Sequence, residues 1–162
     1  MRFLLLLLPL IVFACASDGS AIPGYQSLDL LQYDVPVKIL APDSAKVKTA
    51  SLSGVMQDIT VRSPEDDYAI QILASQASTN DMARLKAEQL ELVRGNRYFS
   101  SVVSEDENGF IFENKIDTTS MYGFRHIVYK GNREFVFQNS FEGVFTLPQV
   151  ERMYKAVRTS GE

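Results

Sequence analysis

Apolar and polar residues alternate along the first half of the chain, as they do in strands with one buried face. Val35, Val37 and Ile39 alternate with Pro36 and Lys38 before Pro42-Asp43 ends the run. Because successive side chains of a strand point to opposite faces, this alternation predicts a strand. Further short strands are predicted at 47–52, 56–62 and 68–74, the last with Tyr68, Ile70 and Ile72 on one face.

The period of the pattern changes to 3.6 residues between residues 80 and 94, which predicts an amphipathic helix. Thr79 or Asn80 can cap the first free amides of this helix. Gly95 suits the left-handed position that often follows a helix. The predicted apolar face consists of Met82, Ala83, Leu85, Leu90, Leu92 and Val93.

The third quarter of the chain predicts two antiparallel hairpins. Asn108-Gly109 is a strong signal for a tight turn in the first hairpin, and Gly131-Asn132 joins the strands of the second. The four predicted strands are 98–104, 110–115, 122–130 and 133–141.

A second helix closes the chain. Thr146 and Gln149 form a capping box, and Pro148 stands in the first turn, where it is tolerated. The apolar stripe of this helix consists of Leu147, Val150, Met153, Tyr154 and Val157. Strands, a helix, more antiparallel strands and a last helix predict an α+β domain over residues 34–160, with a mostly antiparallel sheet flanked by two amphipathic helices.

The first fourteen residues have the order of an export signal. Met1-Arg2 supplies a positive end, and the apolar stretch from Phe3 to Phe13 follows it. This stretch is too short to cross ~30 Å of hydrocarbon, which needs about 20 helical residues. Residues 1–14 are therefore predicted to be a signal peptide that is removed.

The end of this signal resembles the lipobox of bacterial lipoproteins. Val12-Phe13-Ala14-Cys15 gives an aliphatic residue, a free position, a small residue and then cysteine, although Phe13 is bulkier than the residue usual at that place. The resemblance implies that Cys15 is acylated and becomes the first mature residue. The small and polar residues after it predict a flexible tether over 15–33, in which Leu28, Leu30 and Leu31 could form a short helical turn on the domain. The alternative is an ordinary secretory signal followed by a chance cysteine.

Charge argues against nucleic acid as a partner. The chain has 16 basic and 20 acidic residues, and removing Arg2 with the signal leaves 15 against 20. The basic residues are scattered, whereas binding to nucleic acid depends on clustered Lys and Arg that neutralise phosphates. With Cys15 acylated, the domain has no free thiol and no disulfide.

The order of the predicted elements resembles the PsbP-like fold, especially its DcrB-like bacterial lipoproteins. The resemblance covers about residues 33–157, and the phrases that carry it are YDVPVKILAP, DMARLKAEQLELVR and LPQVERMYKAVRTS. The resemblance implies an accessory or binding protein of the envelope or of photosynthetic membranes. It implies no catalytic residues.

His126 is the only histidine, and a catalytic role would need a nucleophile and an acid beside it. It lies between Phe124 and Val128 on one face of a predicted strand, and a packed histidine fits that place better. Zinc would need several histidine or cysteine ligands. We therefore predict no catalytic residue, no metal site and no cofactor.

Calcium is a weaker alternative at the first hairpin tip. Ser104, Asp106, Asn108 and Gly109 match the early positions of a twelve-residue calcium loop, but its last position is Lys115 instead of glutamate. A solvated turn explains the same residues. The aromatic residues of the last two strands could line a ligand groove, although core packing is the better explanation of them: Phe124, Tyr129, Phe135, Phe137 and Phe141.

The sequence therefore predicts an exported bacterial lipoprotein, held on the membrane through Cys15, that acts as a non-catalytic binding or scaffolding module. Ala16 follows the cysteine where aspartate often favours the inner membrane, so the outer membrane is expected. A protein of the envelope is the expected partner. The alternatives are a carrier of a small apolar ligand between sheet and helix, and an enzyme that uses His126.

Overall fold

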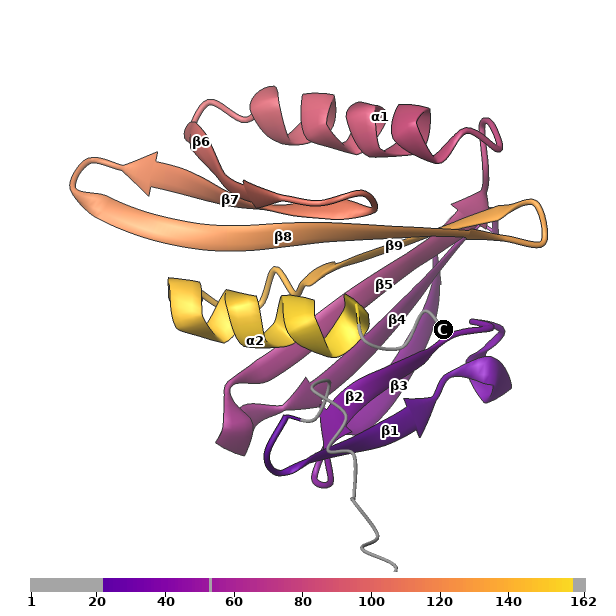
Figure 1. Ribbon diagram of the computed structural model, residues 1–162. Helices are drawn as coiled ribbons and strands as arrows, with labels where there is room; N and C mark the ends of the chain where they lie inside the picture. Colours follow the sequence, from indigo (N-terminus) through magenta and orange to yellow (C-terminus); the bar gives the residue numbers. More distant parts are fainter. Residues whose placement is uncertain (1–21, 53, 159–162) are drawn as a thin grey trace, which may run out of the picture.

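This computed structural model of the protein describes residues 22–52 and 54–158. These residues form a two-stranded and a seven-stranded sheet with two α-helices, α1 (Met82–Arg94) and α2 (Leu147–Arg158) (Figure 1). The small sheet pairs β1 (Tyr25–Asp29) with β2 (Lys38–Pro42). The strands of the large sheet are β3 (Lys46–Leu52), β4 (Met56–Ser63), β5 (Tyr68–Gln76), β6 (Phe99–Glu105), β7 (Gly109–Ile116), β8 (Thr119–Lys130) and β9 (Arg133–Asn139).

The large sheet is antiparallel throughout and has the order β3-β4-β5-β9-β8-β7-β6. Two hairpin-connected series, β3 to β5 and β6 to β9, meet where β5 pairs with β9 and Ile72 lies opposite Phe137. Helix α1 connects β5 in the middle of the sheet to β6 at its edge. The predicted α+β class, with a mostly antiparallel sheet and two helices, is confirmed.

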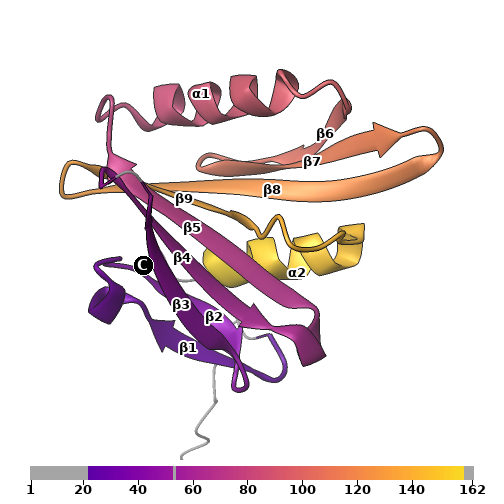
Figure 2. The ribbon, with the colours of Figure 1, turned by 180° about the vertical axis from the view of Figure 1, so that it is seen from behind.

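The two helices lie on opposite faces of the large sheet. Both views show α1 over β6, β7 and β8, and α2 with β1 and β2 on the other side (Figures 1 and 2). The main core lies on the α2 side, and a smaller cluster around Phe110, Phe112 and Val93 lies under α1. Strand β7 contributes to both cores through its alternate residues, because Ile111 belongs to the main core and Phe110 and Phe112 to the smaller cluster.

The alternating strands form close to where the pattern predicts them. Tyr68, Ile70 and Ile72 of β5 are all buried in the main core, together with Ile59 and Val61 of β4. The first predicted strand begins later than expected, because Val35 and Val37 lie in the connection before β2. The amide of Val35 donates to the carbonyl of Leu30 (3.2 Å).

The expected tether is too long at its carboxyl end. Residues predicted to be a linker up to Tyr33 instead form β1 and a 3₁₀ turn at Leu31–Tyr33. Leu30 is fully buried and Ile22 belongs to the main core, so this segment is part of the domain. The turn predicted from Leu28, Leu30 and Leu31 forms later, at Leu31–Tyr33, because Leu28 lies in β1.

The ends of α1 differ from the prediction. The side chain of Asp81, not Thr79 or Asn80, accepts a hydrogen bond from the amide of Arg84 (3.2 Å) and caps the helix. Gly95 has right-handed dihedral angles (φ −68°, ψ −11°), so it is not the left-handed residue that was expected. Leu92 is 70% exposed although the pattern places it on the apolar face.

Helix α2 begins as its capping box predicts. The amide of Thr146 donates to Oε1 of Gln149 (2.8 Å), and Pro148 occupies the first turn. Val150, Met153 and Val157 are buried against the sheet. Within the described residues, neither helix has the length and apolar character needed to cross a bilayer.

Candidate functional site

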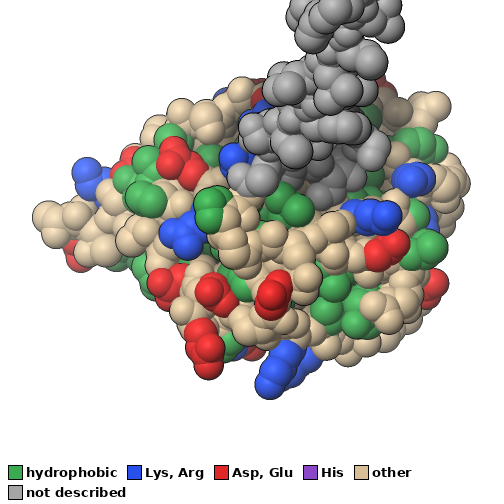
Figure 3. All heavy atoms as spheres, turned by 60° about the horizontal axis from the view of Figure 1, so that its bottom comes forward, with side chains coloured by type: hydrophobic (Ala, Val, Ile, Leu, Met, Phe, Trp, Pro, Cys, Tyr) green, Lys and Arg blue, Asp and Glu red, His purple; other side chains and the backbone are tan. Residues whose placement is uncertain are grey.

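Cys15 and the whole signal segment lie outside the described residues. The candidate sites that the structure describes therefore lie in the domain itself. On the face shown in Figure 3, basic and acidic side chains lie interspersed and neither sign forms a continuous patch.

His126 lies on the α2 side of β8 and is 7% exposed. Its ring stands 6.0 Å from the rings of Phe137 and Tyr154, between centroids. Burial lowers its pKa to about 4, with the charge of Asp106 opposing this shift and that of Arg158 adding to it. The imidazole is therefore neutral at ordinary pH. In residues 22–52 and 54–158, no hydrogen bond joins it to a serine, threonine or other nucleophile, and its Nδ1 atom has no partner.

The tip of the β6–β7 hairpin is fixed to both helices by ion pairs. Nζ of Lys86 lies 2.9 Å from a carboxylate oxygen of Glu105 and donates to the carbonyl of Asp106 (2.7 Å). Nε of Arg158 lies 3.2 Å from Oδ2 of Asp106, and Oδ1 accepts from the amide of Asn108 (3.1 Å). The carboxylates of this tip therefore face basic side chains. No group of three potential metal ligands is found in the described part of the chain.

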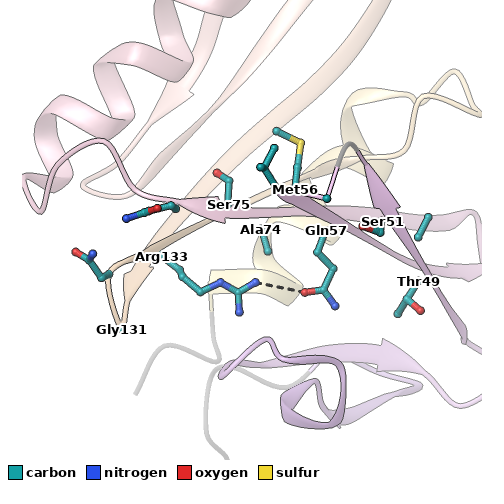
Figure 4. A pocket seen from close by; sticks show the side chains of 13 residues that line it. Thr49, Ser51, Met56, Gln57, Ala74, Ser75, Gly131 and Arg133 are labelled. Carbon is teal, nitrogen blue, oxygen red and sulfur yellow. Dashed lines mark hydrogen bonds between the residues drawn. The ribbon is translucent and has the colours of Figure 1, made fainter.

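A polar hollow of about 650 Å³ lies at the end of the sheet where the β3–β4 and β8–β9 hairpins meet (Figure 4). Figure 4 shows Arg133 pointing toward Gln57, and the two side chains are joined by a hydrogen bond of 3.3 Å. Arg133 also donates to the carbonyl of Asp34 (3.0 Å), while Gln57 donates to that of Tyr33 (3.0 Å). These polar groups hold the 3₁₀ turn against the sheet, so they already have partners.

A second, smaller hollow of about 260 Å³ lies between the end of α1 and the sheet. Residues of β7 and β8 form its floor: Phe112 lies opposite Gly123, Asn114 lies opposite Met121, and Arg125 follows on β8. The loop after β9, with Phe141 and Val144, forms its other wall. We call this hollow the Arg125 groove. It is lined by Leu92, Val93, Asn96, Phe112, Asn114, Met121, Tyr122, Gly123, Arg125, Asn139, Ser140, Phe141, Gly143, Val144 and Phe145.

The groove exists because β9 leaves β8 early. Pairing between these strands reaches only as far as His126 opposite Phe137. Beyond that point, β8 no longer pairs with β9, and the amide of Phe124 donates instead to the side chain of Asn139 (3.1 Å). A Cβ on Gly123 would lie 2.5 Å from Cζ of Phe112, so glycine allows this ring to lie close against β8.

Arg125 is the unusual residue of the groove, because its charge is largely buried and has no acidic partner. Its Nη1 donates to the carbonyl of Phe124 (2.9 Å), and its guanidinium carbon lies 5.5 Å from the centre of the Phe112 ring. Among the described residues, no carboxylate lies within ion-pair distance of it. Burial lowers its pKa to about 10, and no neighbouring charge contributes to that shift.

The rim of the Arg125 groove is apolar. Leu92, Phe141 and Val144 are 70%, 78% and 71% exposed and all line it. On the floor, Oδ1 of Asn114 is buried without a hydrogen-bond partner. A cation, an unpaired amide and three exposed apolar side chains therefore surround one hollow, which suits a small ligand with a polar end and an apolar body.

The sequence did not single out Arg125. Phe141 is the one member of the predicted aromatic series that lies on this groove, while Phe124, Phe135 and Phe137 are fully buried in the core. The available signal was an arginine at an inward position of a strand, between Gly123 and Ile127 on the same face. Its lack of a partner depends on the loop after β9, which the local pattern does not predict.

Comparison with protein-family models gives no match for this chain, and comparison with curated proteins gives none either.

Proposed function

We propose that this protein is an exported bacterial lipoprotein, anchored to the envelope through Cys15, that acts as a non-catalytic binding or scaffolding module. The observation that carries the proposal is the order of the first fifteen residues: a positive end, the apolar stretch Phe3 to Phe13, and one cysteine at a lipobox-like site. The outer membrane, suggested by Ala16, and a protein partner in the envelope belong to the same proposal.

The described domain supports a binding role over a catalytic one. Its single histidine is neutral, packed beside aromatic rings and without a bonded nucleophile. The order of strands, helix, meander and helix supports the resemblance to PsbP-like, DcrB-like proteins, which remains part of the proposal.

The start of the domain limits how far it can stand from the membrane. Ile22 already belongs to the core, so only residues 16–21 separate Cys15 from the domain. Six extended residues reach at most ~20 Å. The side of the domain that carries β1 would therefore lie close to the lipid headgroups, whereas α1 lies on the other side of the large sheet (Figure 1).

Replacing the cysteine tests the anchor. Cys15→Ala removes the thiol that would be acylated, and Ser17→Ala is the matched control two residues away. We expect Cys15→Ala to move the protein out of the membrane fraction and to end incorporation of labelled fatty acid, while Ser17→Ala changes neither. An unchanged membrane fraction for Cys15→Ala would contradict the proposal.

A second candidate function, the carriage of a small ligand, is favoured by the Arg125 groove. This groove lies between the sheet and a helix, where such a ligand was expected, and three exposed apolar side chains line it. Soaking the purified protein with lipid extracts tests this function. A rise in thermal stability that Phe141→Ser removes would support it, and unchanged stability with every extract would contradict it.

A further inference from the structure

We propose that the Arg125 groove binds a small carboxylate with an apolar body, whose carboxylate pairs with the guanidinium of Arg125. This inference rests on the proposed binding function and specifies the chemistry of the ligand.

The charge of Arg125 calls for an anion. A buried charge is costly unless it is paired, and within the described part of the chain Arg125 makes one hydrogen bond, to the carbonyl of Phe124. A guanidinium has five N–H donors in a planar fork. The carboxylate of a ligand would accept two of them side by side and would neutralise the charge.

Arg133, by comparison, is an arginine of the same sheet whose guanidinium makes two hydrogen bonds. It donates to a backbone carbonyl and to the side chain of Gln57, and it too lies over an aromatic ring, Phe135. Arg125 has the ring contact but lacks the second polar partner. Arg125 therefore has more unused N–H donors to offer a ligand than Arg133 has.

The rim indicates the rest of the ligand. Single exposed apolar residues are ordinary on a protein surface, but here Leu92, Phe141 and Val144 come from two separate segments and border one hollow. An apolar body resting on them would cover surface that now faces water. The unpaired Oδ1 of Asn114 on the floor is an acceptor, so it suits a donor group on the body of the ligand and not the carboxylate.

The size of the groove limits the ligand. Its volume of about 260 Å³ corresponds to about nine water molecules at ~30 Å³ each. A ligand of about ten non-hydrogen atoms fits this space, whereas a full-length fatty acid would leave most of its chain outside. Benzoate, with a planar carboxylate on an apolar ring, is a suitable probe.

Binding of benzoate to the full chain in lipid nanodiscs tests the proposal, with empty nanodiscs as the blank. Benzamide has the same shape without the charge and is the control ligand. We expect benzoate to bind at least tenfold more tightly than benzamide, and Arg125→Gln to abolish that preference. Arg84→Gln, on the exposed side of α1, should leave it unchanged.

Phe141→Ser provides a second test, because the exposed side chain of Phe141 contributes little to folding. We expect it to weaken benzoate binding several-fold without changing the thermal stability of the free protein. Equal binding of benzoate and benzamide, or a preference that persists in Arg125→Gln, would overturn the proposal. Membrane anchoring is measured separately, so an anchored protein that does not bind benzoate would refute the carboxylate site and leave the proposed anchor intact.

Discussion

Replacing Arg125 with methionine should stabilise the protein. Methionine keeps a long unbranched side chain but removes a buried charge that has no acidic partner. Most substitutions of a largely buried residue destabilise, so a gain in stability would be a distinctive result.

The size of the effect follows from the environment of the guanidinium. Lowering its pKa to about 10 corresponds to about 3 kcal/mol of disfavoured charge in the folded protein. The hydrogen bond to the carbonyl of Phe124 and the contact with the Phe112 ring offset roughly 2 kcal/mol of this destabilisation. The expected net gain is therefore about 1 kcal/mol, or a rise in Tm of roughly 4 °C for a domain of this size.

Urea denaturation followed by circular dichroism would measure this gain. Arg133→Met is the matched control, because it removes hydrogen bonds to Asp34 and Gln57 and should cost about 1–3 kcal/mol. Opposite signs for the two variants would support the account of the Arg125 groove. If Arg125→Met lowered the free energy of unfolding by more than about 1 kcal/mol, the charge of Arg125 would not be uncompensated, and the prediction would be refuted.

Two further predictions concern the core and the histidine. Burial keeps His126 neutral down to about pH 4, while the histidine of the unfolded chain takes up a proton near pH 6.5. The free energy of unfolding should therefore fall by about 3 kcal/mol as the pH drops from 6.5 to 4. In acid denaturation curves, His126→Gln should flatten this dependence on pH. An imidazole NMR titration with a midpoint near 6.5 would contradict it. Phe124→Ala should lower the free energy of unfolding by about 3–5 kcal/mol because the ring is fully buried. Phe141→Ala should change it by under about 0.5 kcal/mol because that ring is exposed. Similar losses in the two variants would show that Phe141 is packed.

The elements that the sequence predicts well are those with local signals. Strand β3 and helix α2 begin within a residue of their predicted starts, because alternation and the Thr146–Gln149 capping box are local. Strand β1 was missed because its residues are mostly polar and exposed, and it is held by pairing with β2 over a long connection.

The order of the strands could not be predicted locally. Pairing of β5 with β9 places Ile70 opposite Asn139, which are far apart in the chain. The Arg125 groove depends on this same arrangement, because it opens where β9 leaves β8 and the following loop turns toward α1. Leu92 of α1, which is 70% exposed, borders this same groove.

The central claim is that Cys15 carries the membrane anchor of a binding domain. The mass of the intact mature protein, purified from bacterial membranes, tests it most directly. The account predicts a chain that begins at Cys15, lacks residues 1–14 and carries acyl groups on that cysteine. A chain with an unmodified Cys15, or one that retains residues 1–14, would contradict the account.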